Sequence, residues 1–215
     1  MPLLLYYITD CNQFPGNRQE KEQRMLAKIG ECAACGVDYI QLREKDLSVQ
    51  ALEALANQAV AALGHGSQTK LLINSRTDVA LACRAHGVHL PANDLSASKV
   101  RAIFARAKAS SIVIGVSAHS IAEVSATETH GADFAVFAPV FEKAGEINPQ
   151  GLEQLRQICH RPNMTAASMP VLALGGITFA NARQCLEAGA SGIAAIRLFQ
   201  QNDVHQVVKR LRESR

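Results

Sequence analysis

Eight short apolar runs divide the chain, and each is followed by a longer segment with helical spacing of its apolar residues. After the second run, for example, Leu52, Leu55, Ala56 and Ala59 fall on one face of a helix. The runs are Leu3 to Ile8, Tyr39 to Leu42, Leu71 to Ile73, Val88 to Leu90, Ile112 to Val116, Phe134 to Val140, Val171 to Leu174 and Ile193 to Ile196. Strands that alternate with helices form a parallel sheet with helical crossovers. Eight such units of about 25 residues predict a closed (β/α)8 TIM barrel.

The chain length agrees with this fold. A barrel of this kind takes about 200 to 250 residues, and the chain has 215, so we expect one TIM-barrel domain over residues 1–215. A doubly wound open sheet is the alternative. It is weakened because no Gly-x-Gly-x-x-Gly motif opens the first helix, and because polar strand ends are spread along most of the chain.

Composition excludes several classes of function. The net charge of +3 comes from Lys and Arg scattered along the chain, so we expect no nucleic-acid partner. No apolar run approaches the roughly 18 residues of a membrane span. A chain of this size does not need disulfide bonds for stability. The six cysteines therefore predict reduced thiols in the cytoplasm. We interpret Cys32 and Cys35 as small buried helix residues and not as a redox or metal pair.

The ends of the apolar runs carry the polar chemistry, as the carboxyl ends of strands do in barrel enzymes. Gln41, Arg43 and Lys45 close the second run and share one strand face because side chains alternate. Two cations at a barrel mouth suggest a phosphorylated substrate. The alternative is a layer of ion pairs between these cations and Glu44 or other carboxylates.

A glycine turn follows the seventh run. Gly175 and Gly176 let the backbone approach a ligand closely, and Thr178 can cap the helix that opens after them. Ile196 and Arg197 end the eighth run at the equivalent place, and the loops after the last two strands of such barrels often bind phosphate. We therefore predict a phosphate site at these four residues. Gly36, Gly87, Gly131 and Gly189, each before a run, are interpreted as helix C-caps.

Two histidines lie at or near strand ends. His119 follows the fifth run, where an imidazole that titrates near neutral pH can move a proton. The alternative for His119 is a structural role. His89 lies within the fourth run, and we interpret it as a hydrogen-bonded wall residue. The loop at 145–151, which follows the sixth run with no early helix start, is the best candidate for a mobile lid.

Taken together, these strand ends resemble the thiamine phosphate synthase/TenI superfamily over essentially the whole chain. The matching motifs are Gln41-Leu42-Arg43-Glu44-Lys45, Asn74, Gly87-Val88-His89-Leu90, Gly115-Val116-Ser117-Ala118-His119-Ser120, Ala132-Asp133-Phe134 through Pro139-Val140-Phe141, and Gly175-Gly176-Ile177. The resemblance implies a barrel of thiamine biosynthesis that binds a phosphorylated thiazole. In the synthase branch it implies a pyrimidine pyrophosphate and Mg²⁺ as well. The predicted substrate-binding residues are Gln41, Arg43, Lys45, Asn74, Ser117 and Lys143.

The sequence departs from the synthase pattern at two places. Synthases have a Mg²⁺-binding Asp after the Asn, but Ser75 follows Asn74 here, and only Asp94 matches a second metal ligand. The loop after the sixth run has Glu142, Lys143 and Glu146 instead of Thr and several lysines, and carboxylates repel a pyrophosphate. These departures, with Pro91 after Leu90, favour the TenI-like thiazole tautomerases, in which the histidine matching His119 is associated with proton transfer.

Three functions therefore remain open. The first is a thiazole tautomerase that needs no cofactor and uses His119 as proton shuttle, with Arg43 or Lys45 facing the substrate carboxylate. The second is a thiamine phosphate synthase with Mg²⁺ at Asp94. The third is a barrel without activity that binds thiazole phosphate as a regulator. A homo-oligomer is possible in each case.

Overall fold

The computed structural model describes residues 2–109, 112–141, 151–161, 165 and 168–214. Eight parallel strands pair in chain order, and β1 also pairs with β8, where Leu4 lies opposite Gly192. The sheet is therefore closed, and the predicted (β/α)8 barrel is confirmed. No described helix is long and apolar enough to cross a membrane.

The elements alternate as the apolar pattern predicts. The strands are β1 (Leu4–Ile8), β2 (Tyr39–Leu42), β3 (Lys70–Asn74), β4 (Gly87–Leu90), β5 (Val113–Ala118), β6 (Phe134–Phe137), β7 (Val171–Ala173) and β8 (Gly192–Ala195). The helices are the 3-10 turn η1 (Cys11–Gln13), α1 (Arg18–Ala34), α2 (Val49–Ala62), α3 (Thr77–Ala82), α4 (Ala97–Arg106), α5 (Ile121–Thr129), α6 (Gly151–Cys159), α7 (Ala182–Glu187), α8 (Arg197–Gln200) and α9 (Val204–Glu213).

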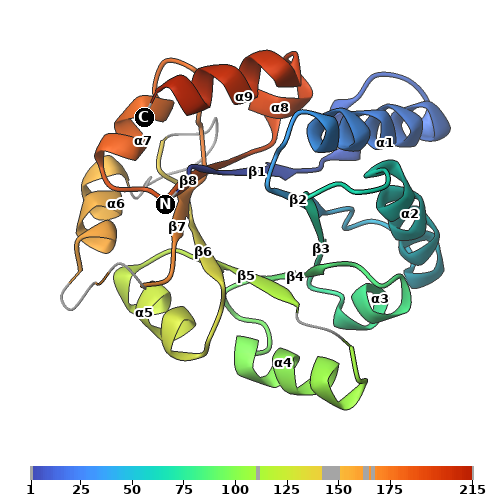
Figure 1. The fold of residues 1–215 in the computed structure, drawn as a ribbon, viewed down its shortest axis with the longest axis horizontal. Helices are drawn as coiled ribbons and strands as arrows, with labels where there is room; N and C mark the ends of the chain where they lie inside the picture. Colours follow the sequence, from blue (N-terminus) through green and yellow to red (C-terminus); the bar gives the residue numbers. More distant parts are fainter. Residues whose placement is uncertain (1, 110–111, 142–150, 162–164, 166–167, 215) are drawn as a thin grey trace.

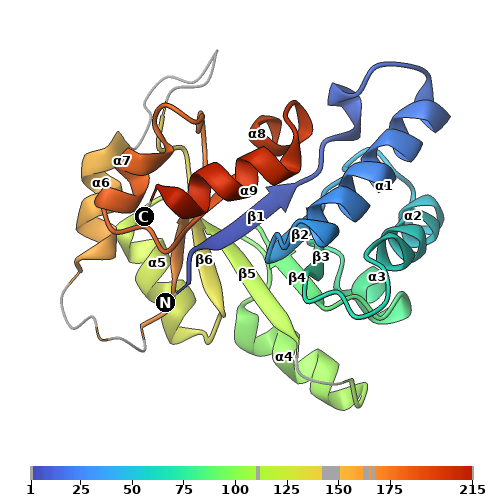
Figure 2. The same ribbon diagram turned by 45° about the horizontal axis from the view of Figure 1, so that its top comes forward.

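The strands form the centre of the molecule and the helices surround them (Figures 1 and 2). Two hydrophobic cores follow from this arrangement. The larger lies between the outward faces of the strands and the helices. The smaller fills the barrel interior with side chains from five of the strands, namely Tyr6, Ile8, Leu72, Phe134, Val136, Leu172 and Ala194.

Local sequence signals explain where the long helix α1 begins and which face it buries. The side chain of Asn17 accepts a hydrogen bond from the backbone N–H of Glu20, and the Glu20 side chain accepts one from Asn17, which is a capping box. Met25, Ile29 and Cys32 then recur at spacings of four and three residues and are buried against the barrel. Burial raises the pKa of the Cys32 thiol, which supports a packing role over a redox role.

Two predictions about strand boundaries need correction. Strand β6 ends at Phe137 and not at Val140, because Pro139 has no N–H to donate to the ladder. Gly87 is not a helix C-cap but the first residue of β4. A Cβ atom at position 87 would lie 1.8 Å from the carbonyl oxygen of Val113, so only glycine lets β4 approach β5 here. Gly36, Gly131 and Gly189 have positive φ, as the C-cap interpretation predicts.

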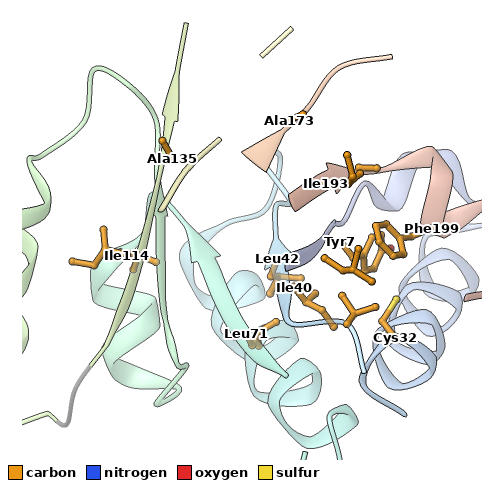
Figure 3. Packing of buried hydrophobic residues seen from close by; sticks show 14 of the residues in the cluster. Tyr7, Cys32, Ile40, Leu42, Leu71, Ile114, Ala135, Ala173, Ile193 and Phe199 are labelled. Carbon is orange, nitrogen blue, oxygen red and sulfur yellow. The ribbon is translucent and has the colours of Figure 1, made fainter. Parts of the chain in front are cut away.

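Tyr7 allows a test of packing in the larger core, which lies between the strands and the helices. Its ring packs on Phe199 with ring centroids 5.8 Å apart, close to Cys32 (Figure 3). Its hydroxyl is buried and has no hydrogen-bond partner among the described residues. Because an unsatisfied buried hydroxyl costs about 1–3 kcal/mol, Tyr7→Phe should raise the free energy of unfolding by about 1 kcal/mol in urea denaturation. Tyr6→Phe should lower it, because the Tyr6 hydroxyl bonds to two side chains. Equal destabilisation by both changes would contradict this view of Tyr7.

Candidate active site

Three predicted substrate-binding residues face the barrel interior at the carboxyl ends of their strands. Gln41 on β2 is buried, and its amide donates to the hydroxyl of Tyr6 at 3.0 Å. Asn74 is the last residue of β3, two residues after the interior residue Leu72, so alternation places it on the same face. Ser117 on β5 is half-buried, and its hydroxyl lies 2.9 Å from Nε2 of His89. The structure brings these residues to one end of the barrel.

Arg43 and Lys45 follow the end of β2 and line a cavity of about 330 Å³ between helices α1 and α2. The predicted alternative, an ion pair with Glu44, is absent. The Glu44 carboxylate instead accepts hydrogen bonds from the Thr9 hydroxyl at 2.7 Å and the Cys11 N–H at 3.2 Å. In the described part of the chain no carboxylate lies within ion-pair distance of Arg43 or Lys45. Both cations are therefore available to an anionic ligand.

A larger cavity, of about 630 Å³, is lined by side chains of α5, α6 and α7 together with His160 and Arg161. It includes none of the predicted site residues. We therefore place the candidate site at the strand ends and not in this cavity.

Ser75 and Asp94 meet at the ends of β3 and β4. The Ser75 hydroxyl donates to Oδ2 of Asp94, and the N–H of Leu95 donates to Oδ1 at 2.7 Å. Ser75 has φ of 62°, a left-handed conformation that is uncommon for serine and is stabilised by its N–H bond to the His89 carbonyl at 2.8 Å. One carboxylate and one hydroxyl thus lie side by side where the sequence predicts half of a metal site.

These oxygen atoms fit Mg²⁺ only if a ligand completes the site. Mg²⁺ is commonly bound by one or two carboxylates together with substrate phosphates. Asp94 supplies one carboxylate, and among the residues that the structure describes no three His, Cys, Asp or Glu side chains form a metal-binding group. Asp94 and Ser75 therefore suit a Mg²⁺ ion that arrives with a phosphorylated substrate.

His119 is exposed at the carboxyl end of the barrel, just after β5. Its Nδ1 lies 2.7 Å from the carbonyl oxygen of Ala138, and its backbone N–H donates to Glu123 at 2.7 Å. Because a carbonyl only accepts, Nδ1 carries the proton and Nε2 of the neutral ring is left as a base. The ring is thus oriented as a proton acceptor, which is the chemical form that the predicted shuttle requires.

The glycine turn lies beside the same rim. Gly175 and Gly176 have φ of 105° and 60°, and a Cβ atom at Gly175 would lie 2.8 Å from Cα of Pro139, the residue after Ala138. The backbone N–H groups of Gly176 and Ile177 make no hydrogen bond within the described residues. Within the described part of the chain they are available to an anion, and the phosphate site at this turn stays a prediction.

The cap predicted at Thr178 is wrong, and Asn181 holds this turn instead. Helix α7 begins at Ala182, and the Asn181 side chain accepts from the Thr178 N–H at 2.7 Å and donates to the Gly176 carbonyl at 3.0 Å. The sequence signal was an Asn placed three residues after the Thr, which commonly forms such local bonds.

Ile196 follows β8 and Arg197 begins helix α8, and both lie near the glycine turn because β7 and β8 are paired. Ile196 is half-buried against the interior core, Arg197 is exposed, and the N–H of Arg197 makes no hydrogen bond within the described residues. Lys143 and most of the predicted lid fall in residues 142–150, outside the described residues.

Sequence reasoning did not identify the two hydrogen-bond partners of His89, which are Tyr6 and Ser117. The interpretation of His89 as a hydrogen-bonded wall residue is confirmed, since Nδ1 lies 3.2 Å from the Tyr6 hydroxyl and Nε2 bonds Ser117. Burial, followed by the charge of Arg43, lowers the pKa of His89 to about 3. The signal in the sequence was that Tyr6 and His89 carry polar groups within the first and fourth apolar runs.

The fold and these strand ends define a class of protein, a (β/α)8 barrel with polar and cationic residues gathered at the carboxyl ends of its strands. Comparison with known proteins narrows the class. Residues 5–199 match the family model described as thiamine monophosphate synthase. The chain therefore belongs to the thiamine monophosphate synthase family, which confirms the predicted superfamily.

Individual relatives extend over nearly the whole chain. "Putative thiamine-phosphate synthase 2" of Aquifex aeolicus is 38% identical over 197 residues, which are 91% of this chain and 96% of that protein. Thiamine-phosphate synthase of Halalkalibacterium halodurans is 35% identical over 89% of this chain and 85% of its own length. The solved structure of a thiamine phosphate pyrophosphorylase from Pyrococcus furiosus has a TM-score of 0.78 and 29% identity, and the match covers 99% and 95% of the two chains.

Proposed function

We propose that this protein is a thiamine-phosphate synthase, which joins a pyrimidine pyrophosphate to a thiazole phosphate. The observation that carries the proposal is its similarity, over 89% of the chain, to a relative with this name. The tautomerase that the departures at Ser75 and in the loop after β6 predict becomes the second candidate. The relatives' names favour the first reading over the second.

The residues at the mouth suit this reaction. A C–N bond forms between the thiazole ring nitrogen and the pyrimidine methylene carbon, and pyrophosphate leaves with the electron pair. The N–H groups of Gly176 and Ile177, which have no hydrogen-bond partner among the described residues, would hold the thiazole phosphate. Arg43 and Lys45, which lack carboxylate partners among the described residues, would hold the pyrophosphate. Asp94 and the Ser75 hydroxyl would hold Mg²⁺, which offsets pyrophosphate charge when bound.

The second candidate, thiazole tautomerase, rests on one specific observation. Nδ1 of His119 is committed to the Ala138 carbonyl, so Nε2 is a free base at the rim next to the glycine turn. Aromatising a carboxythiazole phosphate requires moving one proton from a ring carbon to an exocyclic carbon. One imidazole can do this without a metal.

A paired assay separates the candidates. Purified protein should form thiamine phosphate from the two phosphorylated substrates with Mg²⁺, lose this activity in EDTA and regain it when Mg²⁺ is restored. The same preparation is then tested for aromatisation of carboxythiazole phosphate by ultraviolet absorbance. Aromatisation that persists in EDTA, with no thiamine phosphate formed, would identify a tautomerase. Tight binding of thiazole phosphate with neither reaction would indicate a regulator.

A further inference from the structure

Four polar side chains form a continuous hydrogen-bonded chain across the barrel interior. The amide of Gln41 donates to the hydroxyl of Tyr6 at 3.0 Å, this hydroxyl lies 3.2 Å from Nδ1 of His89, and Nε2 of His89 lies 2.9 Å from the hydroxyl of Ser117. Gln41, Tyr6 and His89 are 1%, 0% and 3% exposed, whereas Ser117 is half-buried at the carboxyl end of β5. The chain therefore runs from the core to the mouth.

Glycine at position 115 makes room for this arrangement. A Cβ atom there would lie 2.9 Å from Nδ1 of His89 and 2.5 Å from the ring of Phe134. The ring of Phe134 in turn packs edge-on against Tyr6, with centroids 5.3 Å apart. The positions of the Tyr6 and His89 rings are thus fixed by packing as well as by hydrogen bonds.

The Gln41 amide donates at one end of these linked hydrogen bonds, and this sets the direction in which each of the other bonds is donated. The Tyr6 oxygen accepts from the Gln41 amide, so its single proton goes to the acceptor that remains, Nδ1 of His89. Nδ1 is then unprotonated, and the neutral ring carries its proton on Nε2. Nε2–H donates to the Ser117 oxygen. The Ser117 proton has no acceptor among the described side chains and is free for a ligand.

The environment keeps the ring neutral, as this direction requires. Burial lowers the pKa of His89 to about 3, and the charge of Arg43 adds to the effect. Arg43 follows the end of β2, the strand that carries Gln41, and among the described residues no carboxylate lies within ion-pair distance of it. An anionic oxygen is therefore the hydrogen-bond acceptor that this part of the mouth favours.

We propose that Tyr6 and His89 are positioning residues that fix the Ser117 hydroxyl as a hydrogen-bond donor toward an anionic oxygen of the substrate. We call the hydrogen-bonded chain of Gln41, Tyr6, His89 and Ser117 the relay. The relay favours a ligand atom with a lone pair next to Ser117 and disfavours a hydrogen-bond donor there. The identity of the ligand, a phosphorylated substrate, rests on the proposed function. The direction of the relay does not.

The direction is tested without substrate by NMR of protein labelled with ¹⁵N-histidine. We expect His89 to show a single neutral tautomer with the proton on Nε2 at pH 7. Tyr6→Phe should remove this preference and give mixed or Nδ1–H signals. Tyr7→Phe, which removes a neighbouring buried hydroxyl without a described partner, should leave the His89 signals unchanged. An Nδ1–H or protonated ring in the unmodified protein would overturn the proposal.

The consequence for ligand binding is tested in the paired assay. Tyr6→Phe should raise the KM for the phosphorylated substrate about tenfold with a smaller change in kcat, whereas Tyr7→Phe should change neither. His89→Gln, which can still donate near the Nε2 position, should retain more activity than His89→Leu. Equal loss in Tyr6→Phe and Tyr7→Phe would show a packing role and refute the relay. If neither reaction is detected in the unmodified protein, the proposed function fails while the NMR result still decides the relay.

Discussion

Asp94→Asn should lower the rate of thiamine phosphate formation by about 10²-fold, because the carboxylate of Asp94 is the charged group available to hold Mg²⁺ beside Ser75. Asparagine keeps the size of the side chain and can still bond to the Ser75 hydroxyl, so the fold should be preserved. The measurement is the steady-state rate across a Mg²⁺ titration. The variant should need more Mg²⁺ to reach half its maximal rate.

Asp78→Asn is the matched control. Asp78 lies at the start of α3, three residues after Ser75, but its carboxylate pairs with Arg76 and is exposed. An exposed ion pair contributes little to stability, so this change should leave the rate within about twofold. Similar losses in both variants would count against Asp94 as a metal ligand. An unchanged rate in Asp94→Asn would exclude the metal site that we assign.

His119→Asn should have its large effect on the aromatisation of carboxythiazole phosphate and not on thiamine phosphate formation. If the protein aromatises carboxythiazole phosphate, kcat should fall by about 10²- to 10⁴-fold with little change in substrate affinity, because asparagine cannot relay a proton near neutral pH. The asparagine amide can still donate to the Ala138 carbonyl, which preserves the local bond. Thiamine phosphate formation should change by less than about threefold.

His130→Asn controls for a general effect of losing an imidazole. His130 is exposed and ends helix α5, just before β6 and so at the opposite end of the barrel from His119. This change should leave both activities unaltered. A fall of less than tenfold in the aromatisation rate of His119→Asn would make His119 a structural residue. A large loss of thiamine phosphate formation would instead give His119 a role in the synthase reaction.

The sequence by itself determined the architecture, because the pattern of buried residues can be recognised within each short segment. Each apolar run and each helical stripe records which side of a short segment is buried, and eight such units leave little choice but a closed barrel. The same alternation placed Gln41 among the strand ends at the barrel mouth, and the family resemblance placed Ser117 there. The glycine turn at Gly175 and Gly176 was also predicted from residue type, and both residues have positive φ, which glycine adopts freely.

Only the tertiary structure decided which of these groups meet. Tyr6 and His89 are 83 residues apart, and their contact depends on the closed sheet and on the space left by Gly115. Glu44 lies next to Arg43 in the chain yet bonds to Thr9 and Cys11, so the cation is left available to a ligand. Gly87 looked like a helix cap because it stands just before an apolar run, but glycine is needed there because a side chain would meet a carbonyl on the neighbouring strand. Hydrogen bonds and close approaches between strands depend on register and on closure of the barrel, and local periodicity does not report either.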